Sequence, residues 1–125
     1  MELRSCILAR GASREGCCTL CGSSLPPKHR KWCSTGCSRS WSTNHVWAQA
    51  RKRALERAGW RCRACGEPFD LVVHHEHPPA KRSPYSTGCW NHQDRLKVLC
   101  RDCHLLEHDR LRTRPGAQLA LFRAA

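Results

Sequence analysis

The sequence predicts an α+β protein in which two small zinc-stabilised modules are joined by a helix. The chain of 125 residues contains 11 cysteines, and eight of them fall into closely spaced pairs typical of zinc knuckles. Modules of about 60 residues rarely bury enough apolar surface to fold unaided, so metal coordination would supply much of the folding free energy. A short β-rich stretch followed by a helical pattern in the second half completes the α+β assignment.

Changes of pattern along the chain divide it into five segments. An aperiodic stretch precedes the first cysteine pair, Gly59 ends one helical pattern, and Pro115 with Gly116 ends another. The expected segments are a flexible N-terminal segment (1–16), a zinc ribbon (17–42), a basic linking helix (43–59), a second zinc-stabilised module (60–114) and a C-terminal tail (115–125).

The first module contains a C-x2-C-G pair and a later C-x3-C pair, formed by Cys18, Cys21, Cys33 and Cys37. Gly22 permits the tight turn at which a knuckle presents its amides to sulfur. These four cysteines are the expected ligands of one structural Zn²⁺. Cys17 is a less well spaced substitute for the first of them, and a buried or redox-active cysteine cluster is the alternative interpretation.

A single helix is expected over residues 43–58. Thr43 is a candidate cap and Gly59 a stop signal, and Trp47 flanks the predicted buried side. That side is a stripe of apolar residues at helical spacing, formed by Val46, Ala50, Ala54 and Ala58. The helix would connect the two modules and present a basic surface.

The formal net charge of +12 points to a polyanionic partner, for which nucleic acid is the expected class. The charge is clustered before the second set of cysteines, at Arg51, Lys52, Arg53, Arg57, Arg61 and Arg63. The alternative is a solvated helix face without a ligand. The apolar stretch at the N-terminus is interrupted by Arg4 and Arg10, so it is not typical of a secretory signal. We therefore expect an intracellular (cytoplasmic) protein with reduced thiols and no membrane segment.

The second module has two C-x2-C pairs, formed by Cys62, Cys65, Cys100 and Cys103. They can close a second structural Zn²⁺ site. Between the pairs, residues 71–75 read as a short strand, and the loop 81–94 is a candidate for a second strand of a hairpin. From Leu96 the pattern predicts a helix whose early turns carry the second cysteine pair.

Histidines left over from the structural sites predict a further metal site. His104 and His108 are four residues apart on the predicted helix, so both can chelate one ion from the same face. His74 and His75 are neighbours on the predicted strand and must point to opposite sides. We expect His74, His104 and His108 to bind the ion and His75 to act as general base. The alternative is a mixed structural zinc cluster in which these histidines replace cysteines.

The second module resembles the HNH endonuclease family in three stretches: CRACG (62–66), VVHHEHPP (72–79) and RLKVLCRDCH (95–104). The resemblance covers roughly the latter half of the chain and implies a ββα-metal fold and metal-assisted cleavage that leaves 5′-phosphate ends. His74 matches the family's first metal ligand, His75 its general base and His104 its later ligand. His108 matches an additional helix ligand of the colicin-type nucleases. The N-terminal half loosely resembles zinc ribbons that precede such nucleases.

One position departs from the family pattern. Arg95 stands where the family carries the Asn that helps to orient the base histidine, and arginine cannot accept a hydrogen bond, although it can grip a phosphate. We expect Asn91 or His92 to take over that task from the loop. If neither does, the protein is a non-catalytic zinc-dependent nucleic-acid-binding adaptor with a degenerate HNH module.

The resulting hypothesis is an HNH-type endonuclease that hydrolyses phosphodiester bonds, with DNA as the expected substrate. Two structural Zn²⁺ ions and one catalytic divalent ion are implied, the latter being Mg²⁺, Mn²⁺, Ni²⁺ or Zn²⁺. The sequence assigns no role to Cys6, Cys17 or Cys89, and it indicates no oligomeric state.

Overall fold

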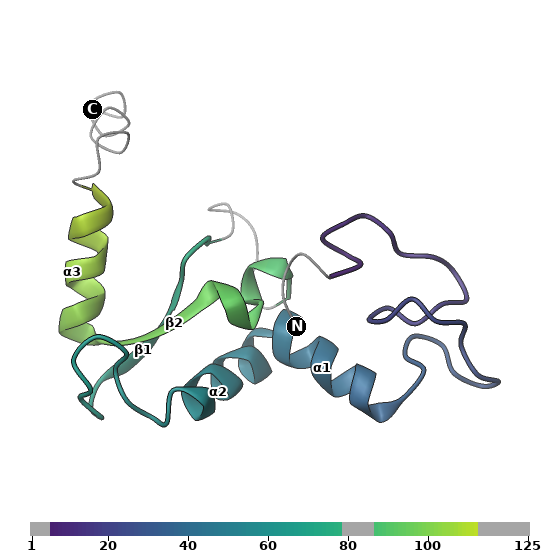
Figure 1. The fold of residues 1–125 in the computed structure, drawn as a ribbon, viewed down its shortest axis with the longest axis horizontal. Coiled ribbons are helices and arrows are strands. Elements are labelled where there is room, and N and C mark those ends of the chain that lie inside the picture. The colour runs from purple at the N-terminus through teal and green to yellow at the C-terminus, as the bar shows by residue number, and fades with distance from the viewer. Residues whose placement is uncertain (1–5, 79–86, 113–125) are drawn as a thin grey trace.

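The computed structural model describes residues 6–78 and 87–112, and within them the protein is a small mixture of helices and one two-stranded sheet (Figure 1). The mixed helix-and-strand class predicted from the sequence is thus confirmed. The elements in chain order are α1 (Thr35–His45), α2 (Trp47–Arg57), β1 (Leu71–His75), the 3-10 turns η2 (Cys89–Asn91) and η3 (Gln93–Arg95), β2 (Leu96–Cys100) and α3 (Arg101–Arg112).

The sheet is an antiparallel pair in which Leu71 lies opposite Cys100 and His75 opposite Leu96. Helix α2 packs on this sheet, and α3 stands at the far end of β2 (Figure 1). The larger apolar cluster lies between α2 and the sheet and consists of Ala50, Ala54, Leu55, Val73, Leu96 and Val98; a smaller one contains Cys62, Leu99 and Cys100. The apolar stripe expected on the linking helix therefore supplies part of this core, through Ala50 and Ala54. So few apolar side chains cannot hold the fold alone, which makes the metal-ligating clusters important to stability.

The prediction of one helix over 43–58 was wrong. Helix α1 begins earlier because Ser34 caps it, its hydroxyl oxygen accepting from the amide of Cys37 at 3.2 Å. Thr43 accordingly lies inside α1 rather than at a cap. The chain then leaves helical geometry at Val46 (φ −94°, ψ 119°), where it bridges to Thr87, and resumes as α2.

The break at Val46 is stabilised by the segment around η2 and η3. A helix end leaves carbonyl groups without partners, and a buried end must have them satisfied. The carbonyl of His45 accepts from the Gly88 amide at 2.8 Å, and the Thr43 carbonyl accepts from the Gln93 side chain at 2.7 Å. Long-range hydrogen bonds thus favour two helices over the continuous helix that local propensity predicts.

The helix predicted from Leu96 also begins later than expected. Residues Leu96–Cys100 form β2, and α3 starts only at Arg101. Leu96 and Val98 alternate toward the core, and pairing with β1 satisfies the backbone, so the strand prevails over the helical pattern. The strand paired with β1 is therefore β2, and none of the described residues 87–94 pairs with β1. Residues 79–86 and the predicted helix end at Pro115 lie outside the described residues.

The described part of the N-terminal segment begins with a buried residue. Cys6 has only 2% of its surface exposed, and its carbonyl accepts from the amide of Arg10 at 3.1 Å. Gly22 adopts the positive φ of +77° expected for the knuckle turn, and a Cβ there would lie 3.1 Å from the Ile7 side chain. Cys6 and Ile7 therefore pack against other parts of the protein, whereas residues 8–16 are exposed.

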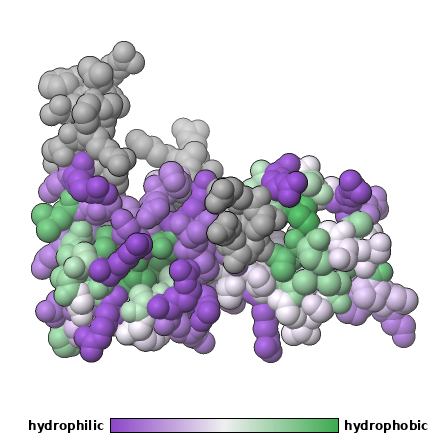
Figure 2. Space-filling view, in the orientation of Figure 1, coloured by the Kyte–Doolittle hydropathy of each residue, from purple (hydrophilic) through white to green (hydrophobic). Residues whose placement is uncertain are grey.

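Hydrophilic side chains cover much of the face seen in Figure 2, with apolar residues between them. The basic residues predicted to form a surface are all exposed, namely Arg51, Lys52, Arg53, Arg57, Arg61 and Arg63. No helix within the described residues is both long and apolar enough to cross a membrane.

Candidate metal centres and histidine cavity

The cysteines of the second module come together between the start of the β1 hairpin and the first turn of α3. Cys62, Cys65, Cys100 and Cys103 have sulfur atoms within 4.8 Å of one another, and the Cys65 and Cys100 sulfurs are 3.6 Å apart. Tetrahedral zinc with Zn–S bonds of about 2.3 Å separates its sulfur ligands by about 3.8 Å. The backbone amides of Ala64 and Cys103 point at sulfur, each at 3.4 Å. This cluster could hold a zinc ion.

A second four-cysteine cluster forms in the ribbon from Cys18, Cys21, Cys33 and Cys37. The Cys33 sulfur lies 3.6 Å from that of Cys21 and 3.5 Å from that of Cys37. Cys18 belongs to this group, whereas Cys17 pairs through its backbone with Ser24. This cluster also has the dimensions of a zinc site.

The acid–base properties of the thiols agree with cation binding. Burial alone would raise the pKa of Cys62, but hydrogen bonds from the backbone of Cys65 and Cys100 lower it to about 6. In the same cluster the pKa of Cys103 is raised, above all by its contact with Cys100. One thiol ionises easily while a neighbour resists, because packed thiolates repel one another. A cation among the sulfurs would offset this repulsion and favour ionisation of the group.

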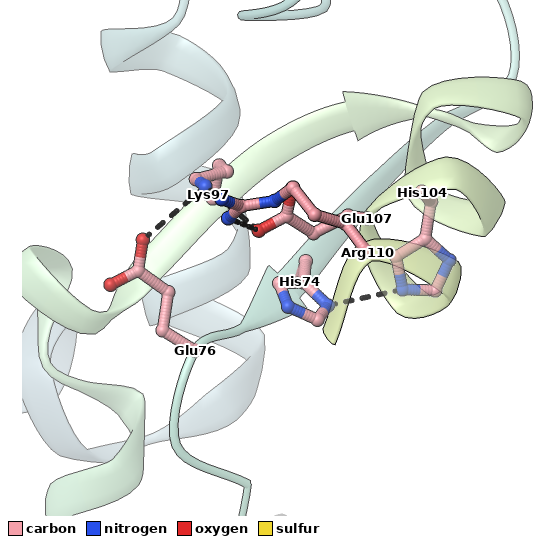
Figure 3. A network of polar contacts seen from close by, with 6 residues as sticks. All are labelled: His74, Glu76, Lys97, His104, Glu107 and Arg110. Atoms are coloured by element: carbon pink, nitrogen blue, oxygen red, sulfur yellow. Dashed lines mark hydrogen bonds and ion pairs between the residues drawn. The ribbon is translucent and has the colours of Figure 1, made fainter. Parts of the chain in front are cut away.

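Three histidines from two elements form a further cluster. His74 comes from β1, and His104 and His108 come from one face of α3 (Figure 3 shows the first two). Nε2 of His104 lies 3.2 Å from Nδ1 of His74 and 3.0 Å from Nε2 of His108. Nitrogen ligands of tetrahedral zinc are about 3.3 Å apart, so these three atoms fit one ion. Burial, reinforced by the neighbouring imidazoles, lowers the pKa of His74, which favours the neutral form that binds metal.

An acidic side chain beside this cluster forms ion pairs with basic side chains. Glu107 lies on α3 between the two histidines and contacts Lys97 at 3.3 Å and Arg110 at 2.7 Å (Figure 3). The hydrogen bond from Arg110, followed by those from Lys97, lowers the pKa of Glu107 to about 2. Lys97 also reaches Glu76 at 3.7 Å. The three-histidine cluster is thus bordered by a charged network in which Glu107 is already paired.

His75 points away from the three histidines and contacts Asn91. Nε2 of His75 lies 2.9 Å from Oδ1 of Asn91, whose Nδ2 donates to the carbonyl of His45 at 2.9 Å. A carbonyl can only accept, so the atom of Asn91 that faces it must be Nδ2, and Oδ1 must face His75. The proton of neutral His75 therefore lies on Nε2, and Nδ1 carries the lone pair. The ring is also supported by Trp47, at 4.6 Å between centroids.

His74 and His75 nevertheless line one cavity. The cavity measures about 420 Å³ and is bordered by both histidines, by His104 and His108, and by Val72, Val73, Glu76 and Pro78. Strand alternation directs the neighbouring side chains to different partners, as expected from the sequence. The cavity consequently combines three converging imidazoles with a fourth that is held in a defined tautomer.

The two proposed substitutes for the family's Asn occupy different places. Asn91 is fully buried and contacts His75, whereas His92 is fully buried among Cys6, His45 and Cys89 and does not line the histidine cavity. The backbone of Arg95 contacts the end of β1, because its carbonyl accepts a hydrogen bond from the Glu76 amide at 2.9 Å. Of the residues singled out around this departure, Asn91 is the one placed to orient His75.

One cluster was missed by the sequence reasoning. Cys6, His45, Cys89 and His92 bring their ligand atoms within 4.8 Å of one another. A signal was present, because Cys89-x2-His92 has knuckle spacing with histidine in place of the second cysteine. The other two members lie far away in the sequence and carry no local pattern.

Comparison with models of protein families, with curated proteins and with solved structures finds no match for this chain. The assignment of a function therefore depends on the residues and their geometry.

Proposed function

We propose that this protein is a metal-dependent endonuclease of the HNH type, which hydrolyses phosphodiester bonds in DNA with His75 as general base. The observation that carries the proposal is the single cavity shared by His75 and the cluster of His74, His104 and His108. On this proposal β1, β2 and α3 are the ββα-metal module. In this module three imidazoles would bind one ion, and the His75 imidazole is oriented separately beside them. Such an arrangement suits the activation of water next to a bound phosphate.

His74 and His75 would have different roles because their side chains point to opposite sides of β1. A divalent ion held by the three histidines would bind a phosphate oxygen and stabilise the leaving alkoxide. Nε2 of His75 donates its hydrogen bond to Oδ1 of Asn91. Nδ1 is therefore the atom that takes a proton from the attacking water. Trp47 and Asn91 hold the ring from two directions, which reduces the motion that would misplace that lone pair.

The charge distribution supports a nucleic-acid substrate. A groove of about 390 Å³ between α2 and β2 is bordered by Arg57, Arg61, Arg63 and Lys97. The Lys97 ammonium is paired with Glu76 and Glu107, so the excess positive charge of the groove comes from the three arginines. A phosphate backbone that lies in this groove would be bound through counterion release and direct contacts with the arginines.

The test is nicking of supercoiled plasmid by zinc-loaded full-length protein across a panel of divalent metals. Single variants His75→Ala and His108→Ala should lose at least about 100-fold in rate, as expected for loss of a general base or a metal ligand. His77→Ala is the matched control, because His77 is exposed and belongs to none of the metal-ligating clusters. It should cut at the wild-type rate.

Arg95→Asn distinguishes the nuclease from the adaptor. A gain of rate in this variant would indicate that the departure from the family pattern reduces activity. If folded wild-type protein binds DNA but cuts neither DNA nor RNA with any metal, the non-catalytic adaptor is the correct assignment. Cutting that persists in His75→Ala would refute the role of His75 while leaving a nuclease.

A further inference from the structure

We propose that Cys6, His45, Cys89 and His92 bind a third structural Zn²⁺, which fixes the η2 turn and thereby positions Asn91 against His75. The first part of this proposal depends only on the cluster itself. The second part, a role in orienting the general base, rests on the function proposed above.

The dimensions of the cluster fit zinc. The Cys6 sulfur lies 3.3 Å from Nε2 of His45, and the Nε2 atoms of His45 and His92 lie 3.2 Å apart. Tetrahedral zinc with one sulfur and one nitrogen ligand separates them by about 3.6 Å, and two nitrogens by about 3.3 Å. Cys6, His45 and His92 have 2%, 1% and 0% of their surface exposed. Such a closed, four-ligand site with two cysteines and two histidines is typical of structural zinc.

The tautomer of His45 is also the one a metal requires. Its Nδ1 lies 2.8 Å from the carbonyl of Trp41, which can only accept a hydrogen bond, so Nδ1 carries the proton and Nε2 the lone pair. A backbone carbonyl in this role is the usual outer partner of a zinc-binding histidine. That single lone pair faces both Cys6 and His92 and cannot accept hydrogen bonds from both. A cation at the centre of the four ligand atoms satisfies all of them at once.

The site would join three segments that are distant in the sequence. Cys6 belongs to the N-terminal segment, and His45 ends α1 at the helix break. Cys89 is the first residue of η2, and His92 follows its last. Gly88 brings the η2 segment to the end of α1, because its amide donates to the His45 carbonyl. Glycine is needed here, since a Cβ would overlap the Trp90 ring. Neither four-cysteine cluster makes this connection, since each lies within one module.

The same turn holds the partner of His75. Asn91 sits between the two proposed ligands of η2, and its Nδ2 donates to the backbone carbonyl of the third ligand, His45. Binding of zinc would therefore fix the position of Asn91 from both sides. Through the 2.9 Å contact between Oδ1 and Nε2, it would also fix the ring of His75. In this account Asn91 is a positioning residue, and the zinc acts on catalysis only through it.

The experiment counts zinc ions per folded chain by native mass spectrometry. All variants carry His104→Ala and His108→Ala, which prevents the three-histidine cluster from adding an ion. The parent should hold three zinc ions and Cys89→Ser two. Cys17→Ser is the matched control, because Cys17 is a half-buried cysteine outside every cluster, and it should hold three. A folded parent with two ions, or a Cys89→Ser variant with three, would overturn the proposal.

A conservative variant covers the case in which Cys89→Ser fails to fold. Cys89→His supplies another zinc ligand and should restore three ions, whereas two ions in this variant would count against the site. The positioning role is read separately, in chains with intact His104 and His108. Cys89→Ser should broaden or remove the His75 Nε2–H proton resonance and slow nicking about tenfold or more, and Cys89→His should recover both. Three ions with no nicking in any protein would uphold the zinc site and refute only the nuclease.

Discussion

Replacing Asn91 by alanine tests the link between the buried hydrogen bonds and catalysis. Asn91 is fully buried and makes two hydrogen bonds of 2.9 Å, one to His75 and one to the carbonyl of His45. Leaving the partner of a buried hydrogen bond unsatisfied costs about 1–3 kcal/mol. With a small additional cavity, Asn91→Ala should lower the free energy of unfolding by about 2–5 kcal/mol. On the proposed function, nicking should slow by on the order of 100-fold, because His75 is no longer held in place.

Asn44→Ala provides a matched control for this loss of stability. Asn44 is an asparagine with 2% exposure that donates to the Ser40 carbonyl at 2.8 Å and accepts from the Gln93 amide at 3.1 Å, with no contact to His75. Denaturant unfolding with zinc in excess should give similar losses for the two variants. Nicking is then compared at low temperature, where both are folded. An equal decrease of rate in Asn44→Ala would show that lost stability, and not the position of His75, explains the effect.

Further predictions concern the core, the four-cysteine cluster of the second module, the basic groove and the pH dependence of metal binding by the three histidines. Leu55→Ala removes a fully buried side chain and should lower the free energy of unfolding by about 2–5 kcal/mol in denaturant titrations. Cys65→Ser should lose one zinc ion by mass spectrometry and the protection of β2 amides from hydrogen exchange. Arg63→Gln should reduce the slope of log affinity against log salt by about 0.9 in DNA-binding titrations. Burial lowers the pKa of His74 and of His104, so both stay in the neutral, metal-binding form to more acidic pH. Calorimetric affinity for the ion should fall as the solution is acidified, and an affinity that does not change with pH would contradict the assignment.

Residues close together in the sequence were the most predictable part of the structure. The two C-x2-C pairs of the second module and the pairs of the ribbon form groups as their spacing indicated. The same holds for His104 and His108, since residues four apart on a helix share a face whatever the remainder of the chain does. Opposite orientations of His74 and His75 follow from strand geometry in the same way. Local periodicity is sufficient wherever ligands come from one turn or one strand.

Long-range contacts decided the features that were missed. A continuous helix through Val46 satisfies every local rule, and it is broken only because Gly88, Asn91 and Gln93 supply donors for the carbonyls released at the break. The strand at Leu96 likewise depends on its pairing with β1. Sequence patterns contain no information about partners that arrive from 21 to 50 positions away, so local propensity alone predicts the wrong element at both places.

The helix break and the additional metal cluster are two consequences of the same arrangement. An unbroken helix would use the carbonyl of His45 internally, and the Asn91 side chain would then lose the acceptor that fixes its orientation. The break releases that carbonyl at the residue whose imidazole reaches Cys6 and His92. One residue therefore contributes its side chain to the proposed zinc site and its backbone to the partner of His75. On the two proposals above, metal binding and the orientation of His75 are coupled through His45, so a change at any ligand of this cluster should alter the environment of His75.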